Sequence, residues 1–97
     1  MWFVYILYSE KLDKYYIGES HDVELRLNRH NTGYYSNKWA EKGKPWVLYL
    51  KMKCTSRSQA LKVEKHIKSM KSKKYIQNLK KYEELRAKLL ARFSTQT

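Results

Sequence analysis

The chain has 97 residues and a formal net charge of +12, which describes one small domain with a large excess of basic side chains. A domain of this length buries one modest core, and no apolar run reaches the ~20 residues that a membrane-spanning helix needs. A single cysteine, Cys54, excludes an internal disulfide and fits a reducing cytoplasm. The apolar start of the chain is not expected to be a secretory signal, because it lacks a basic segment before it. The charge favours a polyanionic partner, nucleic acid first and an anionic membrane second, over the alternative of a charged surface that only keeps the protein soluble. The nine tyrosines and three tryptophans add weight to nucleic acid, because their rings could stack on unpaired bases.

Three strands are expected, and together they predict an antiparallel sheet in an α/β (α+β) domain. The first, 2–8, is aromatic and β-branched, and its continuous apolar run predicts that both of its faces are covered. The link to the second strand, 15–19, has hairpin length and is too short for a parallel crossover. Pro45 precedes the third strand, 46–52, at a position where its missing N–H costs least.

Helices are expected to flank this sheet at 22–31, 57–70 and 73–92. Each follows a side chain that can cap its N-terminus. These capping candidates are Ser20 or Asp22 for the first helix, Thr55 or Ser56 for the second, and Ser72 for the third. We expect residues 1–80 to form the main domain and 81–97 a C-terminal helical extension, which packs back on the domain or pairs with another copy.

Two polar residues of the first helix share a face with apolar neighbours. Arg26 and His30 are one helical turn apart and lie beside Val23 and Leu27 at 100° per residue. Such a placement is unusual unless both side chains look into a pocket. The alternative is a solvated edge of the helix.

Glu64 lies within an apolar arc of the second helix, between Ala60 and Leu61. A carboxylate in such a place is costly unless a cation or hydrogen bonds stabilise it. Lys62, Lys65 and Lys68 are expected on other faces or edges of the helix. The positive group opposite Glu64 is therefore either a lysine or arginine in a structural ion pair or a divalent cation.

The stretch from 31 to 44 is loop-like, basic and aromatic, and a loop of this length in a small domain is usually functional. We expect it to contact nucleic acid. The alternative is a short helix near 37–41 with Trp39 packed on the core. The candidate contact residues are Tyr34, Tyr35, Lys38, Trp39, Lys42 and Lys44.

Few kinds of catalytic site fit the composition. One cysteine and three histidines have no zinc-ligand spacing, and three glycines form no phosphate-binding loop. The remaining side chains suit phosphodiester hydrolysis, because tyrosine and histidine move protons, arginine holds a phosphate, and a carboxylate holds a hard divalent cation.

The order of these residues resembles the GIY-YIG endonuclease family, in particular its small stand-alone members, over roughly 2–79. The resemblance is carried by two short runs followed by single residues. These are Val4-Tyr5, Tyr16-Ile17-Gly18, Arg26, His30-Asn31, Gly33 and Glu64. The chain departs from the family pattern at Phe3-Val4, where the first motif has glycine and isoleucine, and at Glu19, where several members have lysine.

The resemblance implies a role for each matched residue. Tyr5 would orient or deprotonate the attacking water, Tyr16 would line the same site, and Gly18 would allow close packing there. Arg26 would stabilise charge on the scissile phosphate, and His30 would assist proton transfer. Glu64 would bind a single Mg²⁺ or Mn²⁺ ion. Asn78 is a weak match to an asparagine that some members carry.

The function that this resemblance implies is metal-dependent cleavage of DNA in the cytoplasm. Without an added DNA-binding domain, target choice would come from DNA structure, as in repair or recombination, or from a protein partner. Two other interpretations stay open. One is a nucleic-acid-binding protein with a vestigial nuclease site. The other is a basic interaction module that acts through its C-terminal helix, for which a homo-oligomer is one form of pairing.

Overall fold

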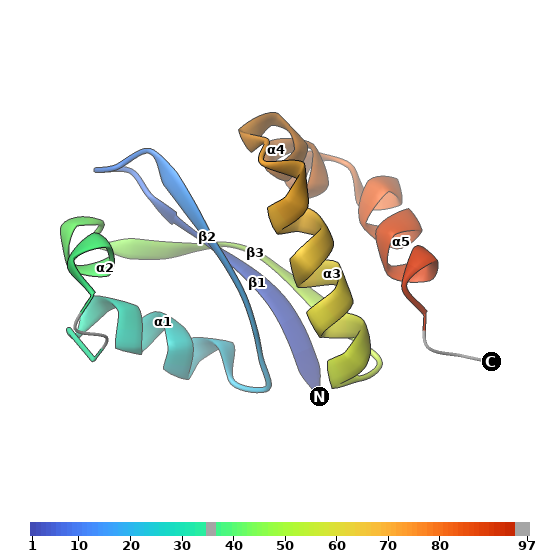
Figure 1. Cartoon of the computed structure of the whole chain (residues 1–97), viewed down its shortest axis with the longest axis horizontal. Helices are drawn as coiled ribbons and strands as arrows, with labels where there is room; N and C mark the ends of the chain where they lie inside the picture. Colours follow the sequence, from blue (N-terminus) through green and yellow to red (C-terminus); the bar gives the residue numbers. More distant parts are fainter. Residues whose placement is uncertain (35–36, 95–97) are drawn as a thin grey trace.

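Three strands and five helices follow one another in the computed structural model, which describes residues 1–34 and 37–94 (Figure 1). The strands are β1 (Trp2–Ser9), β2 (Lys14–Ser20) and β3 (Trp46–Cys54). The helices are α1 (Val23–Asn31), α2 (Lys38–Lys42), α3 (Arg57–Met70), α4 (Lys73–Lys81) and α5 (Glu83–Arg92). The predicted α+β fold is confirmed, and α2 is the short helix that the sequence left as an alternative to a loop.

The sheet has the order β2-β1-β3 and is antiparallel throughout. β1 is therefore the central strand, and its side chains alternate between two separate clusters. Val4 and Ile6 face α3, α4 and α5, whereas Tyr5 and Leu7 pack with Val23 of α1. The prediction that both faces of the first strand are covered is confirmed (Figure 1).

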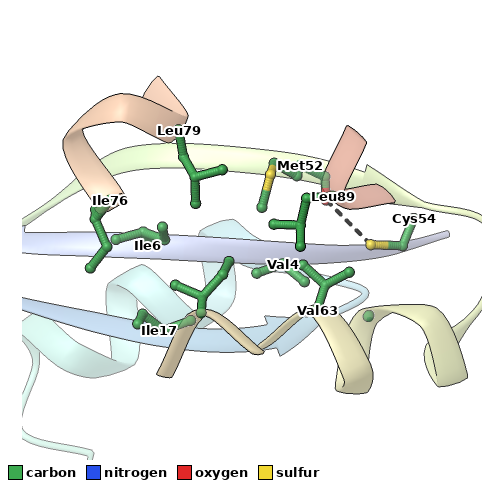
Figure 2. Packing of buried hydrophobic residues seen from close by; sticks show 11 residues of the cluster. Val4, Ile6, Ile17, Met52, Cys54, Val63, Ile76, Leu79 and Leu89 are labelled. Atoms are coloured by element: carbon green, nitrogen blue, oxygen red, sulfur yellow. Dashed lines mark hydrogen bonds between the residues drawn. The ribbon is translucent and has the colours of Figure 1, made fainter. Parts of the chain in front are cut away.

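The larger cluster fills the space between the sheet and the three C-terminal helices. In Figure 2, Val4, Ile6 and Ile17 of the sheet meet Val63 of α3 and Leu79 of α4. These aliphatic side chains are almost completely buried, so this side of the sheet supplies most of the apolar burial that holds the domain together.

Local capping fixes where the helices begin. The Asp22 carboxylate accepts the Leu25 amide of α1 at 3.0 Å, and Ser56 Oγ accepts the Gln59 amide of α3 at 3.1 Å. Ser72 caps α4 in the same way. One residue from each predicted set of capping candidates is thus confirmed, because each accepts one of the amides that a helix start leaves without an internal partner.

The prediction of one continuous helix over 73–92 is wrong. Tyr82 has an extended backbone (φ −114°, ψ 110°) that separates α4 from α5. Arg86 stabilises the break, because its Nη1 donates to the carbonyls of Leu79 and Lys80 at 2.6 and 2.8 Å, at the C-terminal end of α4. After this turn α5 packs back on α3 and α4, where Leu89 is buried.

Within the part of the chain that the structure describes, none of the helices has the length and apolar composition to cross a bilayer.

Candidate active site

Tyr5 and Gly18 lie opposite each other on β1 and β2. A Cβ atom at position 18 would lie 2.6 Å from Tyr5 Oη and 2.7 Å from Cζ, so the Tyr5 ring occupies the space above Gly18. The ring of a residue on the central strand therefore lies across the edge strand β2. Only glycine leaves this space, which explains the need for Gly18 without invoking a special backbone angle.

Tyr16 and His30 extend this aromatic group. The Tyr16 ring centroid lies 6.1 Å from that of Tyr5 and 4.3 Å from that of His30. Tyr16 comes from β2 and His30 from α1, so the contact joins the edge strand to the helix that follows it.

His30 is buried and has a defined tautomer when it is neutral. Its Nδ1 lies 2.9 Å from the Arg26 carbonyl, an acceptor, so Nδ1 carries the hydrogen and Nε2 carries the lone pair. Burial lowers the pKa of His30, and the positive charge of Arg26 lowers it further. The ring is therefore neutral near pH 7 and able to accept a proton.

Arg26 lies one turn before His30 on α1, as the sequence spacing predicts. Its Nε donates to Ser20 Oγ at 3.4 Å, and Ser20 is a buried residue at the end of β2. This contact places the guanidinium beside β2, on the side of the sheet that α1 covers. Sequence analysis considered Ser20 only as a helix cap, whereas Asp22 takes that role and Ser20 contacts Arg26.

Asn31 and Trp46 hold α1, α2 and β3 together behind these side chains. The Asn31 amide donates to the Trp46 carbonyl at 2.9 Å and accepts the Trp46 amide at 2.7 Å, so it continues the strand's hydrogen-bonding pattern. The buried Trp46 indole donates to the Ala40 carbonyl at 2.9 Å. In the sequence Asn31 has a place in a motif but no visible role, because its partner lies fifteen positions away.

Glu64 lies on α3, which covers the other face of the sheet and contacts both β1 and β2. Its Oε2 is 2.7 Å from Lys68 Nζ, one turn further along the helix. The expectation that Lys68 faces elsewhere is wrong, since residues four apart lie on the same side of a helix. The expected apolar arc is also incomplete, because Leu61 is exposed.

The donor chemistry at Glu64 fits a hard divalent cation. The carboxylate is partly buried, with 18% of the side chain exposed, and it already attracts a positively charged group. Among the described residues there is no cluster of three or more His, Cys, Asp or Glu side chains that could hold a metal. An ion at Glu64 would therefore have one carboxylate ligand and complete its shell with water and substrate oxygens, as Mg²⁺ often does.

The predicted contact loop divides into several environments. Arg29 lies over the ring of the exposed Tyr34 at 4.3 Å, and Lys44 forms a 2.9 Å ion pair with Glu41. Lys38 and Lys42 are exposed on α2. Tyr35 lies outside the described residues.

The structure adds two basic residues that sequence analysis missed. Lys51 pairs with Tyr5 across β1 and β3, and Lys53 pairs with Phe3. Because Met52 and Cys54 are buried in the cluster facing α3, the alternating Lys51 and Lys53 lie on the Tyr5 side of the sheet, where both are exposed. The alternation is visible in the sequence, but the register that brings it beside Tyr5 is not.

Two other positions that the sequence singled out, Glu19 and Asn78, lie on the side of the sheet that α3 and α4 cover. Glu19 Oε1 lies 3.7 Å from Arg57 Nη2, so α3 balances the charge of this departure from the family pattern. The backbone carbonyl of Asn78 accepts the Tyr82 amide at the end of α4, and α4 packs on the face away from Tyr5.

Comparison with protein families matches residues 1–82 to the GIY-YIG catalytic domain. The chain belongs to the GIY-YIG family. It is therefore an endonuclease of the phosphodiester-hydrolase class, and nucleases of this family generally depend on a divalent cation. Comparisons with curated proteins and with solved structures give no match.

Proposed function

We propose that this GIY-YIG endonuclease hydrolyses a DNA phosphodiester bond placed at the free edge of β2. The observation that carries the proposal is the packing of Tyr5 over Gly18, which brings a central-strand tyrosine across the edge strand. α1 contacts β2 from one face of the sheet and α3 contacts it from the other (Figure 1). A phosphate at this edge could be approached by Arg26 from α1 and by Glu64 from α3.

Each side chain has a defined task in this proposal. The Arg26 guanidinium, oriented by Ser20, donates hydrogen bonds to the phosphate oxygens and stabilises the charge that develops there. The Tyr5 hydroxyl orients the attacking water. The neutral His30 accepts at Nε2 the proton that the attacking water loses, and its ring contacts that of Tyr16, which lies next to Tyr5.

Glu64 holds the divalent cation, for which Mg²⁺ and Mn²⁺ are the proposed ions. When bound, the cation polarises the phosphate and stabilises the leaving oxygen. Glu64 must exchange its ion pair with Lys68 for the cation, and Lys68 can move away because 53% of its side chain is exposed.

Basic residues on both sides of Tyr5 would hold the rest of the DNA. Lys38, Lys42 and Lys44 lie on or next to α2, and Lys51 and Lys53 lie on β3. Phosphate contacts of this kind position a strand without reading its sequence. A target chosen by DNA structure, a role in repair or recombination, a cytoplasmic location and a partner that guides target choice stay predictions.

A vestigial binding protein is the second candidate, and the Glu64–Lys68 ion pair is the observation that favours it. If the pair is permanent, the carboxylate holds no cation. The protein would then bind DNA without cutting it.

The test is cleavage of end-labelled duplex, nicked, flapped and single-stranded DNA with Mg²⁺, with Mn²⁺ and with EDTA. We expect cation-dependent cutting of at least one form, and no cutting by a Tyr5→Phe variant that binds the same DNA as the parent. Binding by the parent without cleavage under any of these conditions would support the vestigial alternative.

A further inference from the structure

Trp39 of α2 lies at the outer end of the aromatic group that begins at Tyr5. Its ring centroid is 6.4 Å from that of Tyr16 and 4.9 Å from that of the buried Trp46. The side chain packs on Trp46 and still leaves 38% of the residue exposed. The sequence left open whether this residue packs on the core or meets nucleic acid, and the structure shows a ring that is packed on one side and open to solvent elsewhere.

The surroundings of Trp39 are basic. Lys38 and Lys42 are exposed on the same short helix, and Arg29 lies over the Tyr34 ring on the neighbouring segment. An exposed indole among cations suits a nucleobase whose phosphates the cations hold, because the ring supplies a stacking surface and the lysines supply charge.

The position of the ring decides which nucleotide it could reach. Trp39 is one ring contact away from Tyr16, and Tyr16 contacts both Tyr5 and His30. If the scissile phosphate lies beside these three residues, as proposed above, a base that reaches Trp39 belongs to a nucleotide next to the cleavage point.

We propose that Trp39 stacks on an unpaired base adjoining the scissile phosphate, so that the preferred substrate is DNA with unpaired nucleotides at the cleavage point. This inference rests on the proposed nuclease site. A base inside a continuous duplex is paired and stacked on both faces, so it offers no free face to an indole without being extruded. Single-stranded segments, gaps and flaps offer such a face at no unpairing cost. The substrate class is therefore a strand at or beyond a junction, and its recognition is tolerant of base identity.

The test pairs a protein change with a change in the DNA. The cleavage position on a flap or gap substrate is first mapped, and each unpaired nucleotide around it is then replaced in turn by an abasic site. Cleavage of every substrate is compared for wild type, Trp39→Leu, Trp39→Phe and Tyr82→Leu. Tyr82 is a matched control, because it is an exposed aromatic residue at the break between α4 and α5, on the other side of the sheet.

For wild type we expect one abasic position to lower kcat/KM by about 10- to 100-fold. Trp39→Leu should lower kcat/KM for the intact substrate by the same factor. An abasic site at the sensitive position should then lower the kcat/KM of Trp39→Leu no further, because the two changes remove the same contact. Trp39→Phe should keep most of the effect, and Tyr82→Leu should behave as wild type. The preference for unpaired over fully paired DNA should fall in Trp39→Leu.

An abasic profile that is the same for wild type and Trp39→Leu would overturn the proposal, as would a wild type that prefers continuous duplex. If the wild type cuts no DNA, the proposed function fails and the same comparison is made on Kd by fluorescence anisotropy with single-stranded DNA. In that comparison Trp39→Leu is combined with each abasic site. If no abasic site changes the effect of Trp39→Leu on Kd, the stacking proposal is overturned independently of the proposed function. Should Trp39→Leu unfold, Trp39→Phe decides, because its smaller ring must reduce the loss at the sensitive position below that of wild type, and an equal loss would overturn the proposal.

Discussion

The Tyr5 ring occupies the space that a side chain at position 18 would fill. Tyr5 and Gly18 are paired across β1 and β2, and a Cβ atom on residue 18 would meet Tyr5 Oη at 2.6 Å. The two motifs that identify the family are thus joined by direct packing between strands. The glycine of the second motif fixes where the tyrosine of the first can lie.

Gly18→Ala should therefore lower both stability and activity. An added methyl group in this packed contact should reduce the free energy of unfolding by about 1–3 kcal/mol. Elsewhere in a strand the same change stabilises by roughly 0.5–1 kcal/mol, because glycine loses more backbone entropy on folding. Denaturant unfolding shows whether Gly18→Ala lowers or raises the free energy of unfolding. Cleavage by Gly18→Ala, Tyr5→Phe and the double variant then shows whether the loss acts through Tyr5, and additive losses would contradict this account.

Arg26→Ala should lower kcat by about 10²–10³-fold while Kd for DNA changes little, because its charge matters most in the transition state. Arg26→Lys should restore only part of the rate, since a lysine has no planar fork for two phosphate oxygens. Arg92→Ala is the control for the loss of one arginine, because Arg92 lies on α5 over the Phe93 ring, away from the Tyr5 side of the sheet. Single-turnover cleavage measures the rates, and a near-normal rate in Arg26→Ala would remove this residue from the mechanism.

Lys51 and Lys53 should contribute to the salt dependence of DNA binding. Each phosphate contact on duplex DNA adds about −0.9 to the slope of log K against log salt, so the double variant Lys51→Gln/Lys53→Gln should reduce the slope by about 1.8. Lys62→Gln/Lys65→Gln removes the same charge from exposed positions of α3 and should leave the slope close to that of wild type. Equal slopes for the two double variants would show that the Tyr5 side of the sheet is not the binding face.

His30 should make the domain less stable in acid. Because burial lowers its pKa in the folded protein, the unfolded chain takes up a proton first as pH falls below about 6.5. The free energy of unfolding should thus decrease from pH 7 to pH 5, and the decrease should be smaller in His30→Asn, whose amide can still donate to the Arg26 carbonyl. Burial also lowers the pKa of His66, so the difference between wild type and His30→Asn is the relevant quantity. An unchanged pH dependence in His30→Asn would refute the assignment.

Cleavage should follow the same titration. The rate should be constant from pH 7 to pH 8, where His30 is neutral, and should fall in acid as the ring becomes protonated. The rate–pH profile of the wild type on one DNA substrate measures this. A rate that rises on acidification would contradict a proton-accepting His30.

The elements that the sequence predicted well are those with local causes. The apolar run of β1, the hairpin link and the caps at Asp22, Ser56 and Ser72 each act over a few residues. The grouping of Arg26 with His30 also followed from helical spacing alone.

The elements that the sequence missed depend on contacts between distant segments. Arg86 stabilises a break before α5 that helical periodicity does not show, and Asn31 binds the backbone of Trp46. Lys51 lies beside Tyr5 only because of the β1–β3 register. Lys68 could have been predicted from the sequence, since residues four apart lie on the same side of a helix. The expectation that it lies on another face from Glu64 was therefore an error in applying helical spacing.

The account depends most on Glu64, because this carboxylate must hold a cation in the enzyme although it holds Lys68 in the free protein. Glu64→Gln should cost little stability, since an ion pair four residues apart on a helix contributes about 0.3–0.5 kcal/mol, and Lys68, whose side chain is largely exposed, can be solvated once the carboxylate is gone. Lys68→Gln should leave the carboxylate without its competing cation. Lys62→Gln, on the same helix, controls for the loss of one positive charge.

The decisive measurement is the cleavage rate as a function of Mg²⁺ concentration for wild type, Glu64→Gln, Lys68→Gln and Lys62→Gln. We predict no cleavage by folded Glu64→Gln at any concentration, half-saturation of Lys68→Gln at lower Mg²⁺ than wild type, and no change for Lys62→Gln. Cleavage by Glu64→Gln at the wild-type rate, with the same Mg²⁺ dependence in all four proteins, would contradict the proposed site.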